Sequence, residues 1–254
     1  MIPWELVDKT PVPAAGTGLQ LFRRGADFSI RVDGRELMSS RTHGSEETLA
    51  EAALARIATR PKPRVLVAGL GMGYTLAAAL KHLPRGGQIT LVELVPAVAE
   101  WNRGPLADLA GRPLEDPRVS VVIDDLFTVM TTRKKSFDAI LMDVDNGPRG
   151  LTREGNGRLY SRNGLTVAAE ALRPEGVLAV WSAGPDLAFT DRMKAVGFDP
   201  EVVRFPARAS GKGGMHTLWI APFKGTPVPV VPRRAGPTGG RLSSLASRPK
   251  RRKD

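Results

Sequence analysis

The chain of 254 residues is 42% apolar and 25% charged, close to the average of globular proteins, so it can bury a core of ordinary size. It contains no cysteine, which excludes disulfides, cysteine-ligated metal sites and thiol nucleophiles and is compatible with a reducing cytoplasm. The net charge of +11 is concentrated in one segment, because eight basic residues and one acidic residue between Gly225 and Asp254 contribute +7 and leave only about +4 for the rest.

Residues 1–44 are predicted to form a small N-terminal β element. Apolar and polar residues alternate in short runs from Gly18 to Ser40, and turn signals lie at Arg24–Asp27 and at Asp33–Gly34. An alternation with a period of two, interrupted by glycine and aspartate, is typical of an antiparallel hairpin or meander. The segment Met1–Gly18 shows no basic stretch followed by an apolar run, and no window reaches about 18 uninterrupted apolar residues. We therefore expect no export, no membrane partner and a cytoplasmic location.

A helix is predicted next, with Ser45 as its N-cap and its end before Pro61. The apolar side chains that recur in it are Leu49, Ala52, Ala53, Leu54 and Ile57.

From Arg64 onward the chain alternates between apolar strands and helical segments. The predicted strands are 65–68, 88–92, 119–123, 139–142, 176–180 and 216–220. The predicted helices are Tyr74–Leu83, Ala97–Leu109 and Gly164–Leu172. This alternation predicts an α/β fold with a mostly parallel sheet covered on both faces, so residues 45–224 are expected to form the main domain.

Residues 225–254 are rich in proline, glycine and basic residues and have few apolar anchors, so we predict a disordered basic tail. No aromatic residue is interleaved with its charges, and we expect no specific nucleic-acid partner.

The sharpest motif is the segment 65–74, in which a strand runs into Gly69, Gly71 and Gly73 and a helix then begins. Glycines at such a turn allow the backbone to approach a nucleotide closely, although many turns of this kind use glycine for packing alone. Glu93 follows at the end of the second strand, where a carboxylate can accept both hydroxyl groups of a ribose. The alternative for Glu93 is a solvated strand end.

The spacing of the glycines distinguishes between cofactors. A dinucleotide fingerprint requires glycine at the first, third and sixth positions, whereas the sixth position here is Tyr74. The pattern resembles the S-adenosylmethionine-binding version of the Rossmann-like fold. By that resemblance the acids Asp124 and Asp125, at the end of the third strand, would lie near an adenine amino group, and a solvated loop acid is an equal alternative for Asp124.

The fourth strand carries the more specific resemblance. The residues Phe137-Asp138-Ala139-Ile140-Leu141-Met142-Asp143-Val144-Asp145-Asn146-Gly147-Pro148, followed by Leu159-Tyr160 and by Leu172-Arg173-Pro174-Glu175-Gly176-Val177-Leu178, resemble the corresponding segments of the spermidine synthase, or polyamine aminopropyltransferase, family. The resemblance extends from about Leu19 to Phe223. It implies a small N-terminal β element before a Rossmann-like transferase fold whose last strand is antiparallel.

The same resemblance implies the activity and the roles of several residues. The family moves an aminopropyl group from decarboxylated S-adenosylmethionine to an amine acceptor. Asp143 would be the proton acceptor with Asp145 beside it, Asp125 would contact adenine, and Glu93 would contact ribose. The residues implied to bind the amine are His43, Glu46 and Tyr160. A homodimer is one option for the assembly.

The chain also departs from the family pattern. Met72 stands where the family has an acid that holds the amino end of the decarboxylated donor, and the segment 42–47 matches the family's tyrosine–histidine–glutamate segment only loosely. A methyltransferase that uses intact S-adenosylmethionine is therefore an alternative, and a non-catalytic nucleoside-binding protein is a second one. His82 and His216 have no partner at metal-ligand spacing, so no metal site is predicted.

Overall fold

The computed structural model describes residues 2–13, 18–144, 147–148, 157–206 and 215–225 and contains two β-sheets. The first sheet is antiparallel, with the strand order β1-β2-β3-β4. Its strands are β1 (Glu5–Pro11), β2 (Gly18–Arg24), β3 (Asp27–Val32) and β4 (Arg35–Ser39). The predicted small N-terminal β element is confirmed, and β1 adds a strand before the predicted ones.

The second sheet has seven strands in the order β10-β11-β9-β8-β5-β6-β7. Its strands are β5 (Arg64–Ala68), β6 (Gln88–Glu93), β7 (Val119–Ile123), β8 (Phe137–Met142), β9 (Leu172–Ser182), β10 (Glu201–Pro206) and β11 (Met215–Pro222). All pairs from β9 to β7 are parallel, whereas β11 is antiparallel to both of its neighbours. The predicted α/β fold with a mostly parallel sheet and an antiparallel last strand is therefore confirmed.

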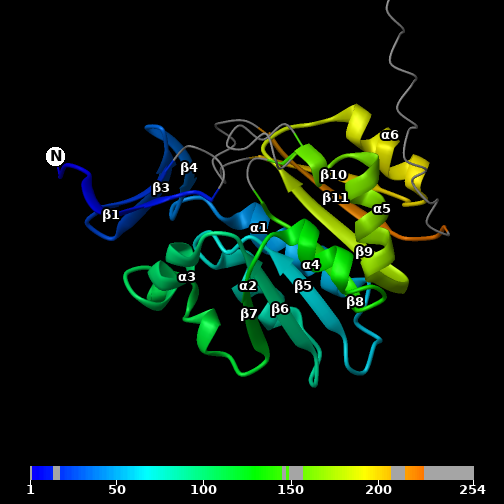
Figure 1. Cartoon of the computed structure of the whole chain (residues 1–254). Coiled ribbons are helices and arrows are strands. Elements are labelled where there is room, and N and C mark those ends of the chain that lie inside the picture. The colour runs from blue at the N-terminus through cyan, green and yellow to red at the C-terminus, as the bar shows by residue number, and fades with distance from the viewer. Residues whose placement is uncertain (1, 14–17, 145–146, 149–156, 207–214, 226–254) are drawn as a thin grey trace, which may run out of the picture.

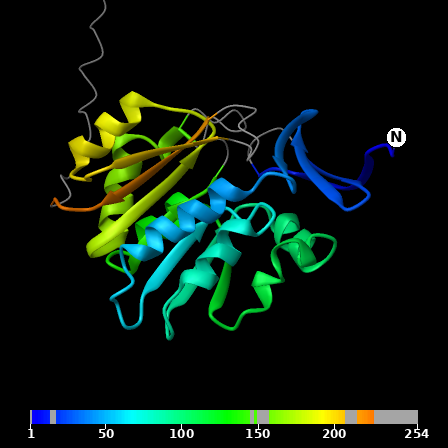
Figure 2. The ribbon, with the colours of Figure 1, turned by 180° about the vertical axis from the view of Figure 1, so that it is seen from behind.

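Six α-helices of the described chain cover this sheet in two layers. They are α1 (Gly44–Ala55), α2 (Tyr74–His82), α3 (Pro96–Arg103), α4 (Leu126–Thr132), α5 (Arg162–Ala171) and α6 (Leu187–Val196). Two 3₁₀ turns follow α3, at Ala107–Ala110 and at Pro113–Glu115. Helices α4, α5 and α6 lie on one face (Figure 1), and α1, α2 and α3 lie on the other (Figure 2).

Successive residues of the central strands enter opposite cores, because side chains alternate across a sheet. In β5, Val65 and Val67 pack with α1, α2 and α3, whereas Leu66 and Ala68 pack with α4, α5 and α6. Strands covered on both faces are apolar throughout, which is why these segments read as continuous apolar runs. The helices of the described residues are all too short or too polar to span a bilayer.

The start of α1 and the end of α3 are two of the boundaries that differ from the sequence prediction. Ser45 is not the N-cap of α1, because the helix begins at Gly44 with His43 at the cap position, and the Ser45 hydroxyl bonds to side chains inside the protein. Helix α3 ends at Arg103 instead of continuing to Leu109. Gly104 leaves the helical conformation there, as expected for a residue that precedes a proline.

The N-terminal sheet packs over the carboxyl ends of the parallel strands. Leu19, Leu21, Ile30 and Val32 turn their side chains from β2 and β3 into the same core that α1, α2 and α3 share. Both views show this sheet beside the ends of the strand arrows (Figures 1 and 2). The arrangement encloses space at the edge of the sheet where an open α/β fold binds its ligands.

Candidate active site

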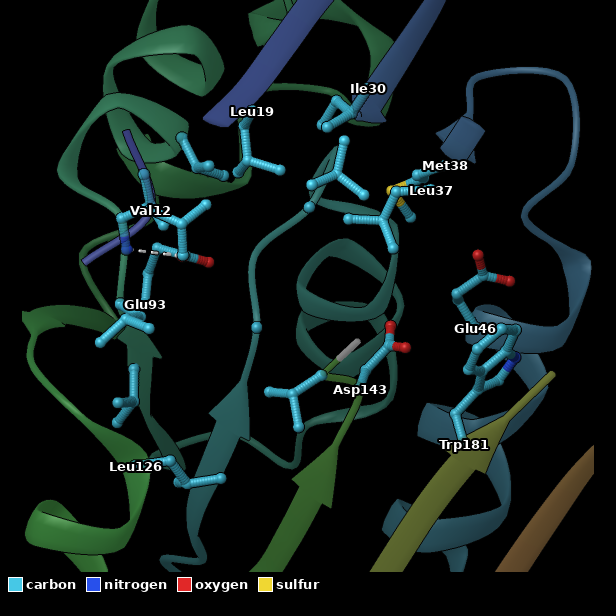
Figure 3. A pocket seen from close by; sticks show the side chains of 18 of the residues that line it. Val12, Leu19, Ile30, Leu37, Met38, Glu46, Glu93, Leu126, Asp143 and Trp181 are labelled. Atoms are coloured by element: carbon cyan, nitrogen blue, oxygen red, sulfur yellow. Dashed lines mark hydrogen bonds between the residues drawn. The ribbon is translucent and has the colours of Figure 1, made fainter. Parts of the chain in front are cut away.

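A pocket of about 400 Å³ lies between the N-terminal sheet and the carboxyl ends of the parallel strands. Apolar side chains of the N-terminal sheet form one wall, and acidic side chains at or just after the strand ends project from the other (Figure 3). Candidate residues from the sequence that line the pocket are Glu46, Gly69, Gly71, Glu93, Asp124, Asp125 and Asp143. The parallel sheet and helix α1 therefore bring together acids that are up to 97 positions apart in the chain.

Gly69 is required by a close approach between two strand ends. Its φ is +86°, and a Cβ atom there would lie 2.2 Å from the carbonyl oxygen of Asp143. The absent side chain thus lets the loop after β5 pack against the backbone that carries Asp143. Two residues further along the loop, the carbonyl oxygen of Gly71 accepts a hydrogen bond from Nδ2 of Asn102 in α3 at 2.9 Å.

Glu93 is buried at the end of β6 and accepts two backbone hydrogen bonds. The N–H of Leu70 donates to Oε2 and the N–H of Val95 donates to Oε1, each at 2.9 Å. Burial raises the pKa of Glu93, and these backbone bonds offset part of that increase. The carboxylate therefore ties the glycine loop to the end of β6, and each oxygen has a further lone pair for a ligand.

Asp143 follows β8, is half-buried in the pocket and accepts a hydrogen bond at Oδ2 from Thr75 Oγ1 at 2.5 Å. Its pKa is raised to about 7, mainly by burial and also by the negative charge of Glu46, while the hydrogen bond from Thr75 lowers it. Glu46 projects from the first turn of α1 into the same space (Figure 3). Burial is also the main cause of the raised pKa of Glu46. This end of the pocket therefore holds two carboxyl groups that a bound cation would favour in their charged form.

Asp124 and Asp125 lie at the opposite end of the pocket. The Asp124 side chain accepts a hydrogen bond from the N–H of Asp125 at 2.7 Å. Asp125 caps α4 by accepting from the N–H of Thr128, and its Oδ1 lies 2.5 Å from an Nη atom of Arg158. Arg158 also stacks on the ring of Phe127 at 4.9 Å. The charge of Asp125 is thus already paired, whereas Asp124 is an exposed residue of the pocket lining.

Four residues singled out from the sequence are not among the described residues that line the pocket. Gly73 caps α2 with a φ of +87°. His43 stacks on Tyr74 with ring centroids 4.2 Å apart and pairs with Glu47. The Tyr160 hydroxyl donates to the carbonyl oxygen of Val144 at 2.9 Å, and its ring is buried. Asp145 lies outside the described residues.

The structure adds residues that the sequence did not single out for this site. Trp181 at the end of β9 and His216 at the start of β11 line the pocket beside Glu46. Both bond to the hydroxyl of Ser45, which is buried behind them. No local motif marks these residues, because each comes from a different element and Ser45 resembles an ordinary helix start.

The pocket suits a ligand with an apolar, flat body and a cationic group. Apolar side chains from Leu19 to Met38 on one wall can cover a ring system, and the acids at the ends of β6 and β7 offer acceptors for hydroxyl or amino groups. The pair formed by Glu46 and Asp143 at the other end favours an ammonium or a sulfonium group by charge.

Known proteins share the sequence pattern and the fold of this chain. Residues 43–190 match the model of the spermine/spermidine synthase domain. The chain is 33% identical over 166 residues to a polyamine aminopropyltransferase of Mycobacterium tuberculosis, a match that covers 64% of this chain and 30% of that relative's length. Two solved structures match 86% of this chain. One is a spermidine synthase in complex with the transition state analogue AdoDATO, with a TM-score of 0.71, 21% identity and 74% of its chain covered. The other is a spermidine synthase from Thermotoga maritima, with a TM-score of 0.68, 20% identity and 72% covered.

Proposed function

Because this chain belongs to the spermine/spermidine synthase family, we propose that it transfers an aminopropyl group from decarboxylated S-adenosylmethionine to an amine acceptor. The observation that carries the proposal is the carboxyl pair of Asp143 and Glu46 at one end of a pocket whose wall from the N-terminal sheet is largely apolar. Asp143 has a pKa of about 7, which suits a group that must accept a proton near neutral pH.

The nucleoside part of the donor is assigned to the end of the pocket at β6 and β7. The free lone pairs of the Glu93 carboxylate accept the ribose hydroxyls, and Asp124 or Asp125 accepts from the adenine amino group. Residues 45–224 supply these contacts, and residues 1–44 cover the ligand with the apolar face of the N-terminal sheet. The burial of Glu93 and the apolar lining from Leu19 to Met38 support this assignment.

The acceptor amine arrives as an ammonium ion and is attracted by Glu46 and Asp143. Its positive charge stabilises the ionised form of Asp143, which then accepts a proton from the nitrogen. The neutral nitrogen attacks the carbon bonded to the sulfonium, a C–N bond forms, and the C–S bond breaks. The sulfur leaves as the neutral thioether methylthioadenosine and needs no acid. The protein contributes mainly orientation of the two substrates and charge stabilisation.

Methyl transfer from intact S-adenosylmethionine is the second candidate, and one observation favours it. Met72 is completely buried among apolar side chains, so the glycine loop carries no acid at that position toward the ligand. An intact donor has a carboxylate that such an acid would repel.

The deciding experiment offers the two donors separately to the full chain, with putrescine or cadaverine as acceptor, and analyses the products by mass spectrometry. We expect aminopropylated amine and methylthioadenosine from the decarboxylated donor only. Methylated product from the intact donor would replace the proposal by the second candidate. Binding of methylthioadenosine without any product would indicate a non-catalytic nucleoside-binding protein.

A further inference from the structure

The hydroxyl of Ser45 joins three side chains from three different elements. It donates to Oε2 of the neighbouring Glu46 at 2.7 Å and accepts from Nε1 of Trp181 at 3.0 Å. It also lies 2.8 Å from Nδ1 of His216. The rings of Trp181 and His216 meet edge to face, with centroids 4.7 Å apart. Helix α1, strand β9 and strand β11 therefore converge on one oxygen atom.

When Glu46 is ionised, the number of donors and acceptors on each group fixes the position of the protons in this cluster. An indole N–H can only donate, and an ionised carboxylate can only accept. The single hydroxyl proton of Ser45 therefore serves Glu46, and its remaining lone pair accepts from His216. His216 must then carry its proton on Nδ1. Burial lowers the pKa of His216, so the ring is neutral at pH 7 and above.

Ser45 does not touch the pocket itself. Glu46, Trp181 and His216 all line the pocket, whereas Ser45 is 6% exposed and is not among the described lining residues. Glu46 is only 5% exposed, and Ser45 is the side-chain hydrogen-bond partner found for its carboxylate in the described part of the chain. A buried carboxylate that loses its donor becomes both less stable and less ordered.

We propose that Ser45 is a positioning residue, which holds the Glu46 carboxylate toward the ammonium group of the amine acceptor. Trp181 and His216 form the walls of the pocket around that carboxylate. The proposal rests on the proposed function. In Figure 3, Glu46 and Asp143 face the same space, and the ring of Trp181 lies beside Glu46. An aromatic wall beside a carboxylate suits a cation, because the ring face attracts positive charge and the carboxylate supplies the counter-charge.

The first test is kinetic and uses Ser45→Ala with Ser45→Thr as the conservative variant. Loss of a hydrogen bond to a charged group lowers affinity about tenfold or more. We therefore expect Ser45→Ala to raise KM for putrescine about tenfold. The kcat should change by less than about threefold, and the Kd of methylthioadenosine should not change, since the nucleoside end is untouched. Ser45→Thr keeps the hydroxyl and should remain within about threefold of the wild type. Thr48→Ala removes an exposed hydroxyl from the same helix and should leave KM, kcat and the Kd of methylthioadenosine unchanged.

A double-mutant cycle shows whether Ser45 acts through Glu46. Glu46→Gln alone should raise KM for putrescine, and adding Ser45→Ala in that background should have little further effect. If the two substitutions raised KM independently, so that the double variant showed the product of the two single factors, the proposal would be overturned. A Ser45→Ala protein that melts like the wild type and has an unchanged KM would overturn it as well. If Ser45→Ala does not fold, Trp181→Phe, which keeps an aromatic ring at this position but removes the indole N–H donor together with part of the ring system, should still raise KM by a smaller factor.

A second readout does not depend on turnover. Nitrogen-15 NMR of the three histidines should place the His216 proton on Nδ1 in the wild type at pH 7.5 and should change for that residue in Ser45→Ala. A proton on Nε2 in the wild type would overturn the assignment. If the wild type forms no product but calorimetry shows that it binds putrescine, about tenfold more weakly after Ser45→Ala, the proposed function fails while Ser45 keeps its role. A wild type that binds no putrescine overturns both.

Discussion

Replacing Asp143 by asparagine should abolish most of the transfer activity while stabilising the protein. The amide is nearly isosteric and its oxygen can still accept the hydrogen bond from Thr75, but it cannot accept a proton from the acceptor amine. General-base catalysis contributes about 10²- to 10⁴-fold, so we expect a loss of kcat within that range. The Kd of methylthioadenosine should stay the same, because the nucleoside is assigned to the other end of the pocket.

The stability effect follows from the raised pKa of Asp143. Its ordinary value is 3.8 and its value in the folded protein is about 7, so between these values the folded state retains a proton that the unfolded state has lost. The free energy of unfolding therefore falls as pH rises through this window and levels off above pH 7. At 1.36 kcal/mol for each pH unit, the cost of the buried carboxylate reaches at most about 4 kcal/mol. Asp143→Asn removes this cost, so its advantage over the wild type should grow from pH 4 to pH 7.

The assay pairs two measurements on the same two proteins. Urea unfolding at pH 4, 5.5, 7 and 8 gives the difference in free energy of unfolding, and product formation over the same range gives kcat/KM. The wild-type kcat/KM should rise with pH up to about 7, since the free enzyme must lose the Asp143 proton. A stability difference that is constant from pH 4 to pH 8 would refute the reasoning on burial. An Asp143→Asn protein with most of its turnover would refute the assignment of the base.

Three further substitutions test other parts of the site. Glu93→Ala should weaken methylthioadenosine binding by about 1 to 3 kcal/mol and lower the melting temperature, because two backbone N–H groups lose their acceptor; unchanged affinity in calorimetry would exclude the ribose contact. Asp138→Ala leaves two arginines without the carboxylate that they share and should cost about 3 kcal/mol in urea unfolding, with normal turnover per folded molecule. Gly69→Ala places a methyl group 2.2 Å from the Asp143 carbonyl oxygen and should lower both stability and kcat; a wild-type kcat would show that the two strand ends can separate freely.

The central strands and the strand-end acids were predictable because their signals are local. A continuous apolar run such as 65–68 is either a buried strand or part of a buried helix. Its short length and the glycine that follows it favour a strand. Strand β1 was missed because its side chains are almost all exposed, so it lacks the alternation that burial imposes. Helix α6 was missed although Asp186 caps it by accepting from the N–H of Phe189, since a capping aspartate after glycine and proline reads equally well as a loop.

The residues of the site also differ in whether the sequence predicts them. Glu93 and Asp143 were predictable as neighbours because parallel strands present their carboxyl ends at one edge of a sheet. This placement follows from the strand ends alone and does not depend on the conformation of the loops. The Ser45 cluster was not predictable, because it joins residues 136 and 171 positions apart that carry no common motif. Their meeting depends on how α1 lies across β9 and β11, which only the packed structure defines.

The position of β11 in the sheet has a consequence for the order of folding. β11 is the last described strand in the chain, yet it lies between β9 and β10 and is hydrogen-bonded to both. During synthesis the edge of β9 must stay unpaired until residues 215–222 have emerged, and only then can His216 reach Ser45. Pairings of such long sequence separation form slowly. We therefore expect the end of the pocket at β6 and β7 to form on the nascent chain before the end at Glu46 and His216, with the open edge of β9 as the segment most exposed to premature association.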